Sequence, residues 1–165
     1  MTFTSDRIST QSINLFDAVS VACNAFNQLS TDDRLGLLWV VYENMGGPIT
    51  PAATGAARLQ FAQGLLTQVK ALSHEDQLAF MRDLTNQRNT PMTRSYGVFT
   101  NNTKLAFWFQ LAEMMRSGVV VGVPKTYQLS RNASQVFGTI MTLEFGQQIA
   151  FLRKVVTNMG YDPLS

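Results

Sequence analysis

The chain has 165 residues, a length typical of a single domain that can bury a sizeable core. Its net charge of +2 and its scattered basic residues do not indicate binding to nucleic acid or to an anionic membrane. The single cysteine excludes an internal disulfide, and the apolar runs are far shorter than the roughly 20 residues that a membrane-spanning helix needs. The first ten residues lack the charged and then apolar pattern of a secretory signal, so we expect none.

Apolar residues recur at helical spacing along most of the chain, which predicts the all-α fold class. Residues 1–12 are polar and are expected to form an N-terminal arm. Helices are expected at about 13–28, 31–45, 54–71, 74–87, 91–97, 131–143 and 147–159, with one more that Asn101 and Asn102 cap and that ends at Ser117. Residues 119–129 look strand-like, but Gly122 and Pro124 favour an extended connection instead.

Several helix boundaries carry chemical signals. The run Ser30-Thr31-Asp32-Asp33 places a capping hydroxyl and early carboxylates before an apolar stretch. Ser73 followed by Asp76 is typical of a capping box. Gly46-Gly47-Pro48 predicts a helix end, and residues 144–146 predict a break before the last helix.

Two helical stripes carry both tryptophans of the chain. Leu35, Leu38, Trp39 and Tyr42 lie at i, i+3, i+4 and i+7 in one predicted helix. In the second stripe Trp108 shares a face with Leu111 and Met115, with Phe109 beside it. The two helices either face each other across a flat, apolar ligand or pack together as core, and periodicity alone favours core packing.

The residues provide no catalytic constellation. His74 is the only histidine and stands in an acidic, exposed helix start, so a zinc site or a Cys–His pair with Cys23 is not expected. The paired carboxylates occupy first helical turns, where the helix dipole accounts for them. Phosphate-loop and dinucleotide-binding fingerprints are missing from the sequence, which therefore does not predict an enzyme.

Six sequence blocks carry a family resemblance: QLSTDDRLGLLWVVYENMG, ITPAATGAARLQFAQ, NTPMTRSY, NNTKLAFWFQLAEMM, GVPKTYQLSRNA and GQQIAFLRKVVTNMGYD. Together they cover almost all of residues 26–162, in order. The chain resembles the N-terminal domain of the cyanobacterial orange carotenoid protein, and in particular the helical carotenoid proteins, which are stand-alone homologues of that domain.

The resemblance implies one carotenoid-binding helical domain over residues 1–165, built as two interleaved four-helix bundles with a ketocarotenoid in the groove between them. The ketocarotenoid would be canthaxanthin, echinenone or 3'-hydroxyechinenone. The family's carotenoid contacts fall on Leu35, Leu38, Trp39, Tyr42, Met81, Asn102, Trp108, Phe109, Met115, Val123 and Tyr127. Phe109 stands where the family often has tyrosine.

Family resemblance also implies a function and partners. A pigment-binding photoprotective protein in a constitutively active-like state would quench singlet oxygen, carry carotenoid or quench phycobilisome excitation in the cytoplasm. Arg153 matches an arginine that in two-domain relatives bridges to the regulatory C-terminal domain and faces the phycobilisome. A stand-alone C-terminal-domain homologue is a candidate carotenoid donor, and light-gated closure within this chain is not expected. The alternative is a pigment-free helical module whose groove takes a partner helix.

Overall fold

Every regular element that the computed structural model describes is an α-helix, as the sequence predicts; the described residues are 18–45 and 59–164. A helical segment covers residues 18–27. It is followed by α2 (Thr31–Met45), α3 (Leu59–Ala71), α4 (His74–Thr85), α5 (Pro91–Gly97), α6 (Asn101–Arg116), α7 (Arg131–Met141) and α8 (Phe145–Thr157).

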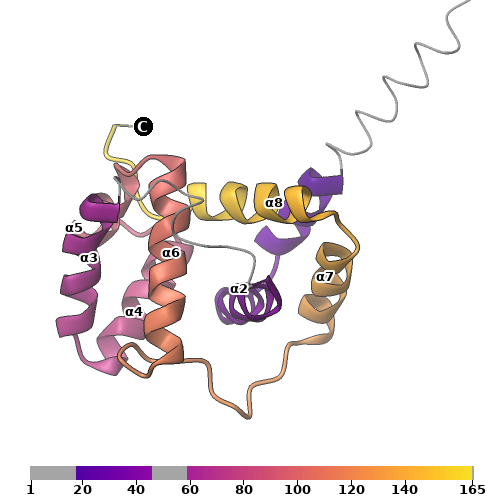
Figure 1. Ribbon diagram of the computed structural model, residues 1–165, viewed down its shortest axis with the longest axis horizontal. Coiled ribbons are helices and arrows are strands. Elements are labelled where there is room, and N and C mark those ends of the chain that lie inside the picture. Colours follow the sequence, from indigo (N-terminus) through magenta and orange to yellow (C-terminus); the bar gives the residue numbers. More distant parts are fainter. Residues whose placement is uncertain (1–17, 46–58, 165) are drawn as a thin grey trace, which may run out of the picture.

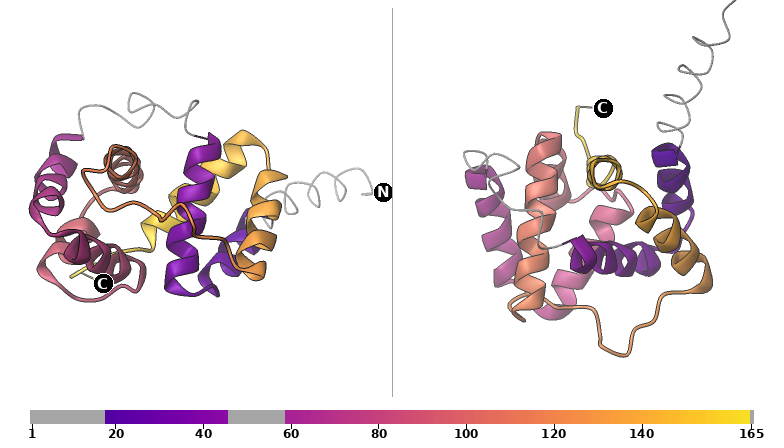
Figure 2. Two further views of the ribbon diagram at one scale, coloured as in Figure 1. Left: turned by 90° about the horizontal axis from the view of Figure 1, so that it is seen from below. Right: turned by 45° about the vertical axis from the view of Figure 1, so that its right-hand side comes forward.

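The helices form two groups that interleave along the chain (Figure 1). One group contains α3, α4, α5 and α6, which pack on one another. The other contains the 18–27 segment, α2, α7 and α8, so its helices come from both ends of the described chain. The two groups meet where α2 packs on α4 and α6 and where α8 packs on α6. Figure 2 shows the same division from two further directions.

Most helix starts follow the predicted capping chemistry. The Ser30 hydroxyl accepts the N–H of Asp33 at 3.2 Å, and the Ser73 hydroxyl accepts the N–H of Asp76 at 3.1 Å. The predicted cap of α6 is wrong by one residue, because Thr100 and not the asparagine pair caps it. The Thr100 hydroxyl accepts the N–H of Thr103 at 3.3 Å from an extended backbone, which is the usual N-cap arrangement.

Several helix limits differ from the sequence prediction, among them the end of α8, which lies at Thr157 and not at 159. The helix α4 stops at Thr85, and Gln87 adopts a left-handed φ of 57°, which ends the turn. The helix α7 ends at Met141. The helix α8 begins at Phe145, inside the predicted break, because the side chain of Gln147 accepts the backbone N–H of Glu144 at 3.0 Å and stabilises the first turn. The predicted arm at 1–12, the helix start at 13, the helix end at 46–48 and the helix start at 54 lie outside the described residues.

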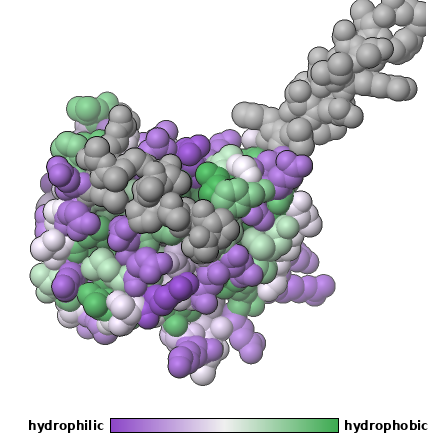
Figure 3. Space-filling model, in the orientation of Figure 1, coloured by the Kyte–Doolittle hydropathy of each residue, from purple (hydrophilic) through white to green (hydrophobic). Residues whose placement is uncertain are grey.

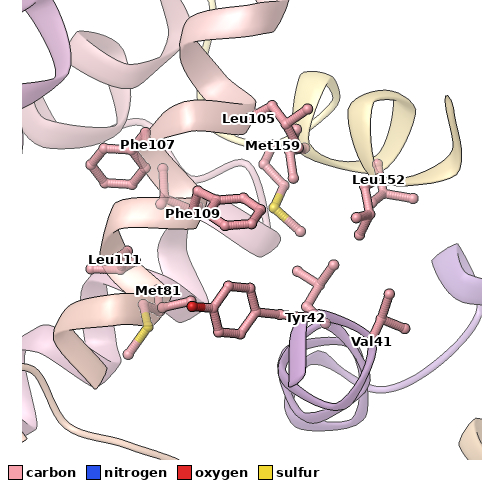
Figure 4. Close-up of a cluster of buried hydrophobic side chains, with 14 of the residues drawn as sticks. Val41, Tyr42, Met81, Leu105, Phe107, Phe109, Leu111, Leu152 and Met159 are labelled. Atoms are coloured by element: carbon pink, nitrogen blue, oxygen red, sulfur yellow. The ribbon is translucent and has the colours of Figure 1, made fainter. Parts of the chain in front are cut away.

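The core between the helices is built from large apolar side chains. Leu37 and Val41 of α2, Phe107 and Leu111 of α6, and Phe151 of α8 are fully buried. Figure 4 shows part of this cluster where α2, α6 and α8 approach one another. Interior burial of this kind is the main favourable term in folding and fixes the positions of the three helices.

The outer surface mixes hydrophilic and hydrophobic residues. The face in Figure 3 shows the two kinds interspersed rather than separated into one continuous apolar belt. Among the described helices, none is both long enough and apolar enough to cross a bilayer.

The connection between α6 and α7 is extended, as predicted, and residues 119–130 contain no strand. A buried glutamine on α4 anchors it. The Oε1 atom of Gln77 accepts the N–H of Val121 at 2.9 Å, and its Nε2 atom donates to the carbonyls of Val69 at 3.1 Å and Leu72 at 3.2 Å. Gln77 is only 1% exposed, so its amide ties three segments together away from solvent.

We predict that Gln77→Leu lowers the free energy of unfolding by about 2 kcal/mol, because the partly buried N–H of Val121 loses its acceptor. Urea denaturation measures the loss. Gln68→Leu, at an exposed position on α3, serves as the control and should change the free energy of unfolding by less than about 0.5 kcal/mol. Equal effects of the two substitutions would contradict the anchoring role of Gln77.

Candidate ligand-binding site

An apolar slot of about 310 Å³ lies between the two helical groups. Side chains from α2, α4, α6, α8 and the connection after α6 form its walls. We use the name slot for the space lined by Asp32, Leu35, Gly36, Leu38, Trp39, Tyr42, Leu78, Met81, Arg82, Leu105, Trp108, Phe109, Ala112, Met115, Val121, Gly122, Val123, Pro124, Tyr127, Leu152 and Val156. Its volume is at the lower end of the range of small-molecule pockets.

The structure brings together nearly all the residues that the family resemblance assigned to the ligand. Leu35, Leu38, Trp39, Tyr42, Met81, Trp108, Phe109, Met115, Val123 and Tyr127 all line the slot. Asn102 does not line it, because it lies exposed in the first turn of α6. Contact with a ligand stays a prediction for all eleven residues.

The α2 wall presents aromatic rings toward α6. Trp39 and Tyr42 have ring centroids 5.8 Å apart, and Tyr42 meets Phe109 edge to face at 5.1 Å. Figure 4 shows the Tyr42 ring reaching from α2 toward α6, with Phe109 and Met81 nearby. Trp39 is only partly buried, so this wall combines a packed interior with an accessible indole.

The α6 wall only partly follows the predicted stripe. Trp108 and Met115 line the slot, as does Phe109. Leu111 instead lies fully buried in the core and is not a slot residue. The wall is completed by Leu105 and Ala112, which fall on the Trp108 side of the helix. The centre of the stripe is therefore rotated away from Leu111.

Sequence reasoning missed slot residues of three kinds. Leu152 and Val156 form an i, i+4 pair on α8, which periodicity could have identified as an apolar face but not as a slot wall. Gly36 is a glycine inside a helical pattern, a sign of close approach by another group. Arg82 gave no signal, because its position at the slot depends on how α4 packs against α2.

Carboxylates hold both slot tyrosines. The hydroxyl of Tyr42 donates to the Glu113 carboxylate, and the Arg116 guanidinium lies 5.4 Å from the centre of the Tyr42 ring. The hydroxyl of Tyr127 donates to Oδ1 of Asp33 at 2.8 Å. Burial and then the carboxylate hydrogen bond raise the pKa of each phenol to about 12. Both rings therefore stay neutral beside the slot at physiological pH.

The Asp33 carboxylate lies beside the slot as an anion. Hydrogen bonds from Ser130 and, to a lesser extent, from Tyr127 lower the pKa of Asp33. Because Ser130 caps α7, this carboxylate joins the start of α2 to the connection and the start of α7. A further ion pair joins Asp32 to Arg82 at 2.9 Å on the same side of the slot.

The Tyr127 ring lies directly against the α2 backbone. A Cβ atom at Gly36 would stand 2.4 Å from Cε1 and 2.7 Å from the hydroxyl oxygen of Tyr127, so only glycine leaves room for the ring. This contact places the connection over α2 as one wall of the slot.

The remaining candidate residue lies elsewhere. Arg153 is exposed on α8 and does not line the slot, although its neighbour Leu152 does. In the described part of the chain, no three His, Cys, Asp or Glu side chains come together in a group that could hold a metal ion.

The residues that line the slot supply ring faces, thioether groups and a few neutral hydroxyls, which suits a flat, apolar and polarisable ligand.

The fold and the slot define a helical ligand-binding domain of two interleaved bundles. The family model described as "Orange carotenoid protein, N-terminal" matches residues 12–162. The chain therefore belongs to the orange carotenoid protein N-terminal domain family, a family of carotenoid-binding proteins and not of enzymes.

Relatives of two lengths support this assignment. An orange carotenoid-binding domain-containing protein of Nostoc sp. PCC 7120 is 55% identical over 100% of this chain and 99% of its own length. The Orange carotenoid-binding protein of Synechocystis sp. PCC 6803 is 43% identical over 88% of this chain but only 46% of its own length. The chain thus spans about half of the longer curated relatives it matches.

Solved structures also include one relative about twice as long as this chain and one of similar length. The Orange Carotenoid Protein of Anabaena (Nostoc) sp. PCC 7120 binding canthaxanthin matches with a TM-score of 0.83 and 46% identity over 89% of this chain and 48% of its own. The Red Carotenoid Protein of the same organism binding canthaxanthin matches with a TM-score of 0.76 and 34% identity, over 87% of this chain and 99% of its own.

We predict that Gly36→Ala gains no stability, although alanine is favoured over glycine within helices by up to about 1 kcal/mol. The new methyl group would displace the Tyr127 ring and break its hydrogen bond to Asp33, which offsets the helix gain. Thermal unfolding measures the change, and alkaline titration should show one more tyrosine with an ordinary pKa.

Gly138→Ala is the matched control, because a Cβ atom at this α7 position meets nothing within 4 Å. It should stabilise the protein by about 0.5–1 kcal/mol and leave the tyrosine titration unchanged. A similar gain from Gly36→Ala would show that Tyr127 does not pack against α2 as described.

Proposed function

We propose that the slot binds a carotenoid and that the protein serves in photoprotection. The observation that supports this best is the wall chemistry of the slot: the indoles of Trp39 and Trp108, the rings of Tyr42 and Phe109, and the thioether of Met81 line one apolar space. Relatives of matching fold are described as binding canthaxanthin, so a ketocarotenoid of that type, echinenone or 3'-hydroxyechinenone is the proposed ligand.

The residues present fit such a ligand. The slot has aromatic rings and soft sulfur atoms in its walls and neutral phenols held by Glu113 and Asp33. Burying on the order of 600 Å² of apolar surface would contribute about 15 kcal/mol at roughly 25 cal/mol per Å². Several kcal/mol of this gain are offset by the cost of association and ordering, which still leaves tight binding.

The bound carotenoid would supply the photophysical chemistry, accepting energy from singlet oxygen or an excited pigment and releasing it as heat. The protein breaks and forms no bond in this proposal. The rings on α2 and α6 would hold the ligand between these two helices. The ion pair of Asp32 with Arg82 keeps the two charged side chains that line the slot paired with each other.

A further part of the proposal concerns what the bound carotenoid quenches. Exposed Arg153 on α8 is available for contact with a partner such as the phycobilisome, whereas a singlet-oxygen quencher or carotenoid carrier needs the slot alone. A stand-alone homologue of the C-terminal domain is the proposed donor of carotenoid, and the cytoplasm, with or without attachment to thylakoids or phycobilisomes, is the proposed location.

Expression of the chain in a carotenoid-producing host tests the proposal. The purified protein should be orange or red, with a polyene absorption band at one carotenoid per chain at most. A colourless protein with full helical content would contradict carotenoid binding and favour a pigment-free module whose slot takes a partner helix.

Trp39→Ala and Trp108→Ala should reduce carotenoid retention at least about tenfold while changing the melting temperature little, because each removes an aromatic wall that is only partly buried. Phe145→Ala is the control, since Phe145 is a half-exposed aromatic of α8 outside the slot. Unchanged retention with a collapsed melting temperature would identify the tryptophans as core residues.

A further inference from the structure

We propose that Tyr96, which does not line the slot, is the positioning residue that fixes the Trp108 indole in the slot wall. The inference rests on the proposed function, because it assigns to this tyrosine the geometry of the surface offered to the carotenoid. Tyr96 lies in the short helix α5, and Trp108 lies on α6.

A chain of two hydrogen bonds joins the slot wall to the end of α8. The Nε1–H of Trp108 donates to the hydroxyl oxygen of Tyr96 at 3.0 Å, and the Tyr96 hydroxyl donates to the carbonyl of Val156 at 2.5 Å. The donor and the acceptor in each of these hydrogen bonds are fixed, because an indole N–H can only donate and a phenol has a single proton to donate. Val156 itself lines the slot, so the chain begins and ends on slot residues.

Tyr96 cannot move without disturbing its surroundings. Its side chain is fully buried, and its ring meets the Phe107 ring at 5.4 Å. The ammonium of Lys104 lies 5.4 Å from the centre of the same ring and donates to the carbonyl of Thr157 at 3.0 Å. Gly160 also lies against this ring, because a Cβ atom at that position would stand 2.4 Å from Cδ1 of Tyr96.

A fixed Tyr96 constrains the orientation of its partly buried neighbour Trp108. Trp108 is only partly buried, and packing alone would leave its indole free to tilt in the slot. The hydrogen bond from Nε1 removes that freedom by tying one edge of the indole to the core. Trp39, the other slot indole, has no such acceptor for its N–H within the described residues, which makes it an internal reference.

The geometry can be tested in the pigment-free protein, because the chain has only two tryptophans. Nitrogen-15 spectra should show two indole N–H resonances, which Trp39→Phe assigns. In Tyr96→Phe the Trp108 resonance should move upfield and its proton should exchange with solvent at least about fivefold faster, as expected for a lost buried hydrogen bond. The Trp39 resonance should stay in place.

Thr93→Val provides the matched control. It removes another fully buried hydroxyl from the same helix, one that donates to the carbonyl of Arg88 and does not contact Trp108. It should lower the melting temperature without moving the Trp108 resonance. Equal shifts of the Trp108 indole resonance in the two variants would mean that Tyr96 has only a structural role, which contradicts the inference. A Trp108 resonance that does not move in Tyr96→Phe would overturn it as well.

The carotenoid-loaded protein supplies the second readout. Tyr96→Phe should lose carotenoid about fivefold faster and shift or broaden its absorption band, and neither change should appear when Trp108→Phe is already present. If Tyr96→Phe speeds carotenoid loss and changes the absorption band equally in a protein that already carries Trp108→Phe, the inference is overturned. A wild-type chain that binds no carotenoid would end the proposed function, while the resonance test still decides whether Tyr96 holds Trp108.

If Tyr96→Phe does not fold, the nitrogen-15 spectra of the wild-type protein test the inference instead. Slower solvent exchange of the Trp108 indole proton than of the Trp39 proton supports the inference, and equal exchange contradicts it.

Discussion

The structure depends on an interface between two helical groups that packs at its centre yet leaves an apolar slot. Leu37 and Val41 of α2 and Leu111 and Phe107 of α6 close the core, while Trp39 and Trp108 on the same helices border open space. Rigid aromatic rings keep such a space open more readily than flexible aliphatic side chains do, because the rings cannot bend to fill it. An empty apolar slot also forfeits contacts, so a ligand that restores them is favoured.

Polar contacts hold the walls of this slot in place. Glu113 and Asp33 fix the two slot tyrosines, Gln77 anchors the connection after α6, and Tyr96 ties Trp108 to the end of α8. None of these contacts places an unpaired charge in the slot. The contacts to the three aromatic residues act on polar groups at the ring edges, namely the hydroxyls of Tyr42 and Tyr127 and the indole N–H of Trp108.

Much of the fold could be predicted from the sequence. Helical periodicity and capping residues such as Ser30 and Ser73 identified the all-α class and most helix starts. The errors were local: Thr100 replaced the asparagines as the cap of α6, and Gln147 extended α8 by stabilising an earlier turn. Such choices depend on which side chain reaches a free N–H, and spacing alone does not decide this.

The slot was predictable only in part. The α2 stripe of Leu35, Leu38, Trp39 and Tyr42 could be identified from spacing and does line the slot, but spacing alone could not distinguish a slot wall from core. Leu111 shares the predicted stripe of Trp108 and lies in the core instead. Local patterns could identify the apolar face of α8 and suggest a close approach at Gly36, but the partners of α8, Gly36 and Tyr96 come from distant segments, which such patterns do not reveal.

A crystal structure of the protein purified with its carotenoid would test the central claim most directly. We expect continuous density for one polyene chain along the slot, in contact with Trp39 on one side and Trp108 on the other. Density for the carotenoid outside the slot, or the two indoles closed against each other in a loaded protein, would contradict the account.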